Sequence, residues 1–365
     1  MYMLTNEQRE CFGLVKIEDT WELLEVKASP YDNFQTYAFV DGTQLKKCIV
    51  VGEKEYQEFT YEDEYLSDDL KFILPKTHKG KPVLLSSSNL LKRTHFGMTL
   101  AYAGEYLALY NKTSELDYYI NSYDGYDPKN LEDFIEWVEK WCEETTVEDI
   151  EDIKSFANQP RKHIKYKEGD VFRYKINRRL YGYGRLILNY DLLRKNKTPF
   201  WDCLFGKPLL VSAYHIVTED KNVSIEELAK LKSLPSGLMM DNSLYYGQFE
   251  IIGNILVDSE KEDYNIRYGH SISRDEKAVV FQQGKTFIKL DNEVVVHGGF
   301  SNNGIGFCMD VELPILLACI KENSNQPYWD WKNTFKIQDD LRNPKFIQEL
   351  KDIEEQLGIE IKVNC

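Results

Sequence analysis

Short runs in which apolar and polar residues alternate dominate the first 110 positions of the chain. A period of two places successive side chains on opposite faces of a strand, so these runs predict β-structure. Gly, Pro and Asp separate the runs, which is typical of an antiparallel meander. Residues 53–69 interleave tyrosines with acids and fit either an edge strand or a loop. The sequence predicts a short polar helix at 5–12 and strands at 21–27, 35–40, 47–51, 81–85 and 98–110.

The pattern changes to a helical period near residue 127. Between Leu131 and Trp141 an apolar residue recurs every three or four positions, and acids fill most of the remaining positions. Asp127 followed by Pro128 predicts the start of this helix, with Asp as the cap and Pro at the first helical position. Thr146 with an acid three residues later is close to a capping box and predicts a second helix. We expect both helices to cover the meander with their acidic faces outward.

A strict alternation returns at 169–176, and a polar turn at 177–179 leads to a second run at 180–188. The two runs predict a β-hairpin. Gly182 and Gly184 interrupt the return strand, where glycine is typical of a bulge, a bend or a close approach of another backbone. Such a hairpin suits a small curled barrel. Further strands are expected at 209–217, 245–257, 278–282, 286–290, 293–297 and 359–363, and helices at 224–232, 314–321 and 343–357.

A basic, proline-containing stretch at 157–168 separates these two patterns. It predicts a boundary between an acidic α+β domain at 1–160 and a β-rich domain with C-terminal helices at 161–365. A length of 365 residues also fits two hydrophobic cores. The predicted fold class is α+β, with each domain a mostly antiparallel, curled β-sheet or small barrel covered by helices.

Composition indicates a folded protein of the cytoplasm. Aromatic residues make up 13% of the chain, which is ample material for packed cores. The N-terminus lacks the basic and apolar regions of a signal peptide, and no run approaches the roughly 18 apolar residues of a membrane span. The 7 cysteines form no CxxC pair, and their odd number fits a reducing compartment. We therefore expect a cytoplasmic protein that has no membrane partner and no zinc site.

The net charge of −15 lies entirely in the first half of the chain. Residues 1–160 hold 31 Asp and Glu against 16 Lys and Arg, and segments 53–69 and 132–152 supply 18 of those 31 acids. A solvated face that keeps the protein soluble and a docking face for a basic partner are both consistent with this distribution. Direct binding of nucleic acid is not expected there, because phosphate contacts need clustered cations.

No pattern of catalytic or metal-binding residues stands out in the sequence. The 6 histidines lack HxH and HExxH spacing, and no GxSxG motif is present. The glycine-rich stretch 298–306 lacks both the Lys-Ser/Thr pair of a P-loop and a βαβ context. A loop or bulged turn is the simpler interpretation of it, and an anion site is the alternative. We expect no catalytic residue, no metal and no cofactor.

The predicted hairpin also carries a motif. Gly-Asp-Val-Phe at 169–172 precedes Tyr-Gly-Tyr-Gly-Arg at 181–185. This arrangement resembles the opening of the immunity protein 26 family of bacterial polymorphic toxin systems, in which a Gly-Asp-x-Phe strand, a short turn and a Tyr-Gly-x-Gly-Arg strand follow one another. By strand pattern the likeness extends over about 165–300. The matching positions are Gly169, Asp170, Phe172, Tyr181, Gly182, Gly184 and Arg185.

The resemblance implies a non-catalytic protein that neutralises a cognate toxin by binding it. A toxin that degrades nucleic acid must present a basic surface, which an acidic inhibitor can cover and reach quickly through electrostatic steering. We therefore expect a protein toxin as partner, for example a nuclease, and place its contact on the first domain, with two tyrosines as anchors. The predicted partner-binding residues are Glu58, Tyr61, Glu62, Asp63, Glu64, Tyr65, Asp68 and Asp69.

Two other functions stay open. An enzyme or small-ligand-binding protein would use a pocket in the second-domain barrel, and a deep pocket joining the predicted side chains would favour it. A nucleic-acid reader would use the basic linker and the cations of the hairpin, although the acidity of the whole chain disfavours this role. The pocket residues are Tyr181, Arg185, His215 and His297, and the hairpin cations are Arg173, Lys175, Arg178 and Arg179.

Overall fold

The computed structural model describes residues 2–27, 33–200, 206–270, 279–290, 313–331 and 340–363. The chain divides into two compact units, Met1–Lys162 and His163–Cys365. Both units combine antiparallel sheets with helices, which confirms the predicted α+β class. Within the described residues each sheet is open and none closes into a barrel, so the open-sheet alternative is the correct one. No described helix has the length and apolar character needed to cross a bilayer.

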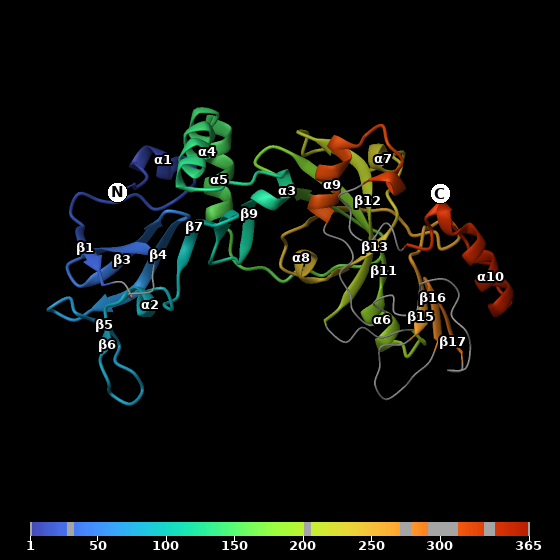
Figure 1. The fold of residues 1–365 in the computed structure, drawn as a ribbon, viewed down its shortest axis with the longest axis horizontal. Coiled ribbons are helices and arrows are strands. Elements are labelled where there is room, and N and C mark those ends of the chain that lie inside the picture. Colours follow the sequence, from blue (N-terminus) through green and yellow to red (C-terminus); the bar gives the residue numbers. More distant parts are fainter. Residues whose placement is uncertain are drawn as a thin grey trace. The chain divides into compact units, whose positions relative to one another are not determined.

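A nine-stranded antiparallel sheet forms the framework of unit 1 (Figure 1). Its main path runs β1-β2-β3-β4-β7-β8-β9, and the short strands β5 and β6 extend from β4. The strands are β1 (Glu22–Val26), β2 (Phe34–Asp41), β3 (Gln44–Gly52), β4 (Glu55–Leu66), β5 (Phe72–Leu74), β6 (Val83–Leu84), β7 (Phe96–Ala103), β8 (Tyr106–Asn111) and β9 (Leu116–Ile120). The helices are α1 (Asn6–Cys11), α2 (Ser87–Leu90), α3 (Asn121–Asp124), α4 (Leu131–Glu143) and α5 (Val147–Ala157).

Each face of this sheet packs against its own hydrophobic core. On one face the rings of Tyr56 and Tyr102 stack on Phe134 of α4, with centroids 5.1 and 5.2 Å apart. Residues of α1, α4 and α5 complete this core, and Figure 1 shows α4 beside α5. The opposite face buries Val50 and Phe59 together with Leu90 of α2. Because both faces are covered around the centre of the sheet, its central strands are buried on both sides.

The predicted meander is confirmed, because β1, β2 and β3 pair in succession and antiparallel. The prediction of an edge strand or loop for 53–69 is wrong. Strand β4 occupies this segment and pairs with both β3 and β7, so it is a central strand. The single strand predicted at 98–110 is two strands, β7 and β8, which pair with each other.

The two predicted helices are present, but one starts later than expected. Helix α5 has the predicted capping box of Thr146 with Asp149. Helix α4 begins at Leu131, and its N-cap is Asn130 instead of Asp127. The Asn130 side chain accepts a hydrogen bond from the Asp133 amide at 2.9 Å, which satisfies a free N–H of the first turn directly before the apolar stripe begins.

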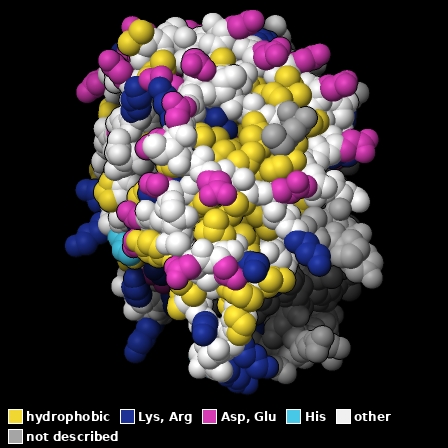
Figure 2. Space-filling view, turned by 90° about the vertical axis from the view of Figure 1, so that its left-hand side faces the viewer, with side chains coloured by type: hydrophobic (Ala, Val, Ile, Leu, Met, Phe, Trp, Pro, Cys, Tyr) yellow, Lys and Arg dark blue, Asp and Glu magenta, His cyan; other side chains and the backbone are white. Residues whose placement is uncertain are grey.

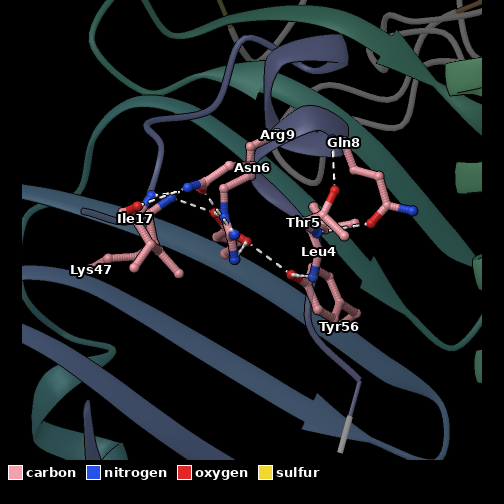
Figure 3. Close-up of polar contacts among 9 residues, drawn as sticks. Leu4, Thr5, Asn6, Gln8, Arg9, Ile17, Lys47 and Tyr56 are labelled. Atoms are coloured by element: carbon pink, nitrogen blue, oxygen red, sulfur yellow. Dashed lines mark hydrogen bonds and ion pairs between the residues drawn. The ribbon is translucent and has the colours of Figure 1, made fainter. Parts of the chain in front are cut away.

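Glu58 of β4 is the centre of a buried network of charges in unit 1. Figure 3 labels its partners Arg9, Lys47 and Tyr56. Its carboxylate accepts hydrogen bonds from Arg9 Nε at 2.8 Å, from Tyr56 Oη at 2.8 Å and from Lys47 Nζ. Burial alone would raise the pKa of Glu58, but the charges of Lys47 and Arg9 outweigh it and hold the pKa below its ordinary value. Because Arg9 lies in α1, the network attaches the N-terminal helix to the centre of the sheet.

Unit 2 contains a five-stranded antiparallel sheet in the order β13-β12-β11-β10-β14 and a three-stranded sheet β15-β16-β17. The strands are β10 (Asp170–Lys175), β11 (Tyr181–Asn189), β12 (Pro208–Thr218), β13 (Gly237–Met240), β14 (Glu250–Asn254), β15 (Ile266–His270), β16 (Val279–Gln283) and β17 (Thr286–Leu290). The helices are α6 (Tyr190–Lys195), α7 (Ile225–Leu228), α8 (Asn242–Tyr245), α9 (Leu313–Glu322) and α10 (Ile347–Leu357), with 3-10 turns η1 (Tyr328–Asp330) and η3 (Pro344–Phe346).

The predicted hairpin is confirmed as β10 and β11, which pair from Val171 with Arg185 to Lys175 with Tyr181. The strand predicted at 359–363 is wrong, because this segment forms no strand within the described part of the chain. Its apolar residues belong to the core cluster that contains Ile353 of α10. The strand predicted at 245–257 is reduced to β14, since α8 occupies its beginning. The strand predicted at 293–297 and the glycine-rich stretch 298–306 lie outside the described residues.

We predict that Glu58→Gln destabilises unit 1 by about 3–5 kcal/mol, because it leaves the charges of Arg9 and Lys47 buried without a counter-charge. Glu62→Gln is the matched control, since Glu62 lies on the same strand but is exposed, and its effect is expected within about 0.5 kcal/mol. Urea-dependent hydrogen exchange of β3 and β4 peptides in the full chain measures both effects. Equal effects of the two substitutions would contradict the prediction.

Candidate partner-binding surface

The partner-binding set predicted on β4 is divided by the structure. Glu58 and Tyr61 are 0% and 3% exposed, so neither can contact a partner on a folded surface, and their inclusion is corrected. Glu58 is held in the charge network, and Tyr61 packs in the core beside α2 while its hydroxyl donates to the Leu90 carbonyl at 3.1 Å. The sequence pattern does not reveal this burial, because the residues around a buried acid in a central strand do not differ in kind from those around an exposed acid.

The C-terminal end of β4 and the turn after it are exposed. Glu62, Asp63, Asp68 and Asp69 lie on the surface, and Tyr65 is 44% exposed. Asp69 pairs with Lys71 at 3.4 Å, whereas no ion pair to another described residue involves the other three acids. Most of this local negative charge is therefore available to a partner.

Glu64 is the half-buried member of the predicted set. Burial raises the pKa of its carboxyl group, and the guanidinium of Arg93, 3.6 Å away, acts in the opposite direction. Because Arg93 already neutralises part of its charge, Glu64 contributes less to the field of this surface than its exposed neighbours.

A second acidic surface lies on α4, as the sequence predicted. Glu132, Glu136, Glu139 and Glu143 are exposed and follow one another at spacings of four, three and four residues, which places them on one side of the helix. The opposite side of α4 buries Phe134, Val138 and Trp141. Among the described residues no cation forms an ion pair with these four glutamates. The excess charge of unit 1 is thus on the surface and largely uncompensated.

The motif of the β10–β11 hairpin has a steric explanation. Phe172 lies directly opposite Gly184, and a Cβ at Gly184 would come within 2.6 Å of the Phe172 ring. Tyr174 lies opposite Gly182 in the same way, at 2.8 Å. Gly169 has φ +88° and would bring a Cβ within 2.5 Å of the Ile255 carbonyl oxygen. Glycine is required where an aromatic ring or a backbone approaches this closely.

The polar residues of the motif also form contacts within unit 2. Asp170 accepts hydrogen bonds from the Lys167 amide and from Asn254 Nδ2, both at 2.8 Å. Arg185 pairs with both carboxylate oxygens of Glu262, which is 77 residues away in the sequence. Tyr181 is buried, and Arg173 and Lys175 lie over its ring at 5.8 and 5.9 Å. The motif therefore maintains the hairpin, and its residues are not grouped on an open surface.

These contacts also bear on the cations proposed for a nucleic-acid reader. Arg173 Nη2 pairs with Glu250 at 2.5 Å, and Arg178 is 8% exposed. Phosphate binding needs several exposed and uncompensated cations. The structure therefore offers little support for this alternative at the hairpin.

Unit 2 also contains a pocket of about 610 Å³. Arg185 and His215 line it, as the ligand-binding alternative predicted, but Tyr181 is not among its lining residues and His297 lies outside the described residues. Tyr328, Trp329 and Trp331 form an aromatic wall. The pocket thus joins two of the four predicted side chains. Within the described part of the chain no group of three or more His, Cys, Asp or Glu residues has the arrangement of a metal site.

Sequence reasoning missed Arg342, which is one of the residues that line this pocket. Its side chain is 3% exposed, and its guanidinium group pairs with Asp263 at 2.8 Å and Asp340 at 2.7 Å. It also donates to the Ser236 carbonyl at 2.7 Å, and so connects segments about 100 residues apart. A single arginine in a polar segment gives no sign of such a role. The aromatic run at 328–331 was the one available signal for the pocket wall.

Residues 167–278 match the model of the family described as Immunity protein 26. All seven motif residues lie inside the matched region, and the match confirms the resemblance that the hairpin motif indicated. No curated protein and no solved structure shows a significant match to the chain.

We predict that Gly184→Ala destabilises unit 2 by about 1–3 kcal/mol, because the new methyl group overlaps the Phe172 ring. Phe172→Leu removes the edge of the ring that the new methyl group would overlap. The double substitution should therefore lower the free energy of unfolding by less than the sum of the two single substitutions. Hydrogen exchange of β10 and β11 peptides measures all three variants. Strictly additive effects would show that the ring and the glycine do not depend on each other.

Proposed function

We propose that the chain is an immunity protein that neutralises a cognate toxin by binding it without turnover, because residues 167–278 match the model of the immunity protein 26 family. The family match carries this proposal. The uncompensated acids of unit 1 support it, since a toxin that acts on nucleic acid must present cations to phosphate. An acidic inhibitor competes for those cations and associates quickly with them.

The proposed role makes specific demands on affinity and rate. A toxin inside the cell that makes it must be captured before it acts, which favours fast association and slow dissociation. Clustered surface charge raises association rates by a factor of about 10 to 1,000 at low salt. Slow dissociation, by contrast, requires buried apolar contacts at the centre of the interface.

A stoichiometric titration tests the proposed function. The gene immediately upstream is sequenced first, and the toxin module that we expect it to encode is mixed with increasing amounts of the full chain. Free and bound species are counted by native mass spectrometry. We expect a complex of defined stoichiometry, no mass change in either protein, and loss of toxicity only when the chain is at least equimolar in co-expression.

Two results would count against this function. Inactivation of the toxin by much less than an equimolar amount would indicate turnover and would favour an enzyme acting at the pocket of Arg185 and His215. Failure of an equimolar or larger amount to bind or protect would remove the immunity role itself. Arg185→Lys tests whether such turnover occurs at the pocket. The substitution should change the rate of an activity at the pocket, but it should not change the affinity of binding through unit 1.

We predict that the exposed acids of the predicted partner-binding set steer the toxin toward the chain electrostatically. Reversal of all four charges by Glu62→Lys, Asp63→Lys, Asp68→Lys and Asp69→Lys should slow association with that toxin module by about 10-fold at low salt. The same variant should show a weaker dependence of the association rate on ionic strength, because less attractive charge remains to be screened. Stopped-flow measurements at several salt concentrations provide both values. Unchanged association kinetics would refute the steering role.

A further inference from the structure

The segment that leads into strand β1 combines dense negative charge with exposed apolar surface. Residues 18–25 contain four acids and no Lys or Arg. Glu18, Asp19, Glu22 and Glu25 are all exposed, and no described cation pairs with any of them. Leu23, between the last two, is 44% exposed.

Leu23 extends an apolar area beyond the part of the sheet that the helices cover. It lies opposite Phe39 and shares its face of the sheet with that residue, whose side chain belongs to the core beneath α1, α4 and α5. Trp21 and Ile17 pack against the rim of the same core and are only partly buried. Figure 2 views the molecule from the side on which β1 lies, and it shows an apolar area bordered mainly by acidic side chains, with Lys and Arg side chains below it.

Strand β1 is also an edge of the nine-stranded sheet. It pairs with β2 on one side, and no other described strand pairs with it. Such an edge strand presents unpaired backbone N–H and C=O groups, which can bind another extended chain. The face therefore has an apolar centre, a charged rim and an unpaired strand edge, which are common features of protein recognition surfaces.

Charge decides which occupant fits this face. A second copy of the chain would bring the same four acids against one another, and like charges at an edge act against self-pairing. A basic protein would neutralise them while it covers Leu23. The acidic surface on α4 lacks an apolar centre of this kind, because the apolar residues of that helix face the core.

We propose that the β1 face, formed by residues 17–25, is where the toxin docks, through a basic segment that lies along the strand edge and covers Leu23. This inference rests on the proposed function and adds the surface that performs it. The exposed acids at the C-terminal end of β4 and in the turn after it then accelerate the encounter, whereas the β1 face holds the complex together.

Dissociation rates distinguish docking from steering. The docking variant carries Glu18→Lys, Asp19→Lys, Glu22→Lys and Glu25→Lys, and the matched control is the steering variant with four reversals at 62, 63, 68 and 69. Both change the net charge equally and both alter exposed side chains. The immobilised probe is the toxin module encoded by the upstream gene, and binding is followed by surface plasmon resonance at about 0.15 and 0.5 M salt, because the higher salt screens long-range attraction.

The docking variant is expected to dissociate at least about 10-fold faster than wild type at both salt concentrations, whereas the control should change the association rate alone. Leu23→Thr, which keeps the charge and the β-propensity, should also accelerate dissociation. Circular dichroism and thermal unfolding verify that each variant is folded.

Equal dissociation rates for wild type, the docking variant and Leu23→Thr would overturn the docking proposal and leave the proposed function intact, since wild type still binds. No binding by wild type would overturn both. A wild-type dimer in solution that Leu23→Thr dissociates would show that a second copy occupies the face, and would also overturn the proposal.

Discussion

A single buried carboxylate, that of Glu58, organises unit 1. It sits in a central strand where burial strongly disfavours charge, and it remains ionised because Arg9 and Lys47 reach it from two other elements. The interaction joins α1, β3 and β4, and so fixes the N-terminal segment across the sheet. That segment leads directly to the edge strand β1. The geometry of the proposed docking face therefore depends on a charge network in the interior of the same unit.

Within the described residues, unit 1 pairs its buried charges in the interior and leaves most of its acids without an ion pair on the surface. In the interior one acid has two cations and a tyrosine hydroxyl as partners. On the surface the reverse holds, since acids on α4 and on both sides of Leu23 have no partner among the described cations. Carboxylates that stabilise the fold are thus separate from those that create a long-range field. Substitutions at the second group can alter recognition while leaving the core as it is.

The sequence was sufficient to predict the fold class, the meander, the capping box of α5 and the hairpin with its family motif, because period, caps and glycines are local signals. It was insufficient where the decisive contact is distant. Whether β4 is an edge or a central strand depends on β7, and the fate of Glu58 depends on Arg9, 49 residues away. For the same reason, acidity alone could not separate the buried members of the binding set from the exposed ones.

Leu317 of α9 packs against Gly182 of the motif hairpin. Tyr174 Oη also donates to the Leu313 carbonyl at 3.0 Å, so α9 covers one face of the motif hairpin. That helix lies beyond the matched residues 167–278. Excised at those limits, the segment would leave Tyr174 and its glycine partner open to water. In this chain the matched region is therefore covered on this face by a helix from outside its own limits.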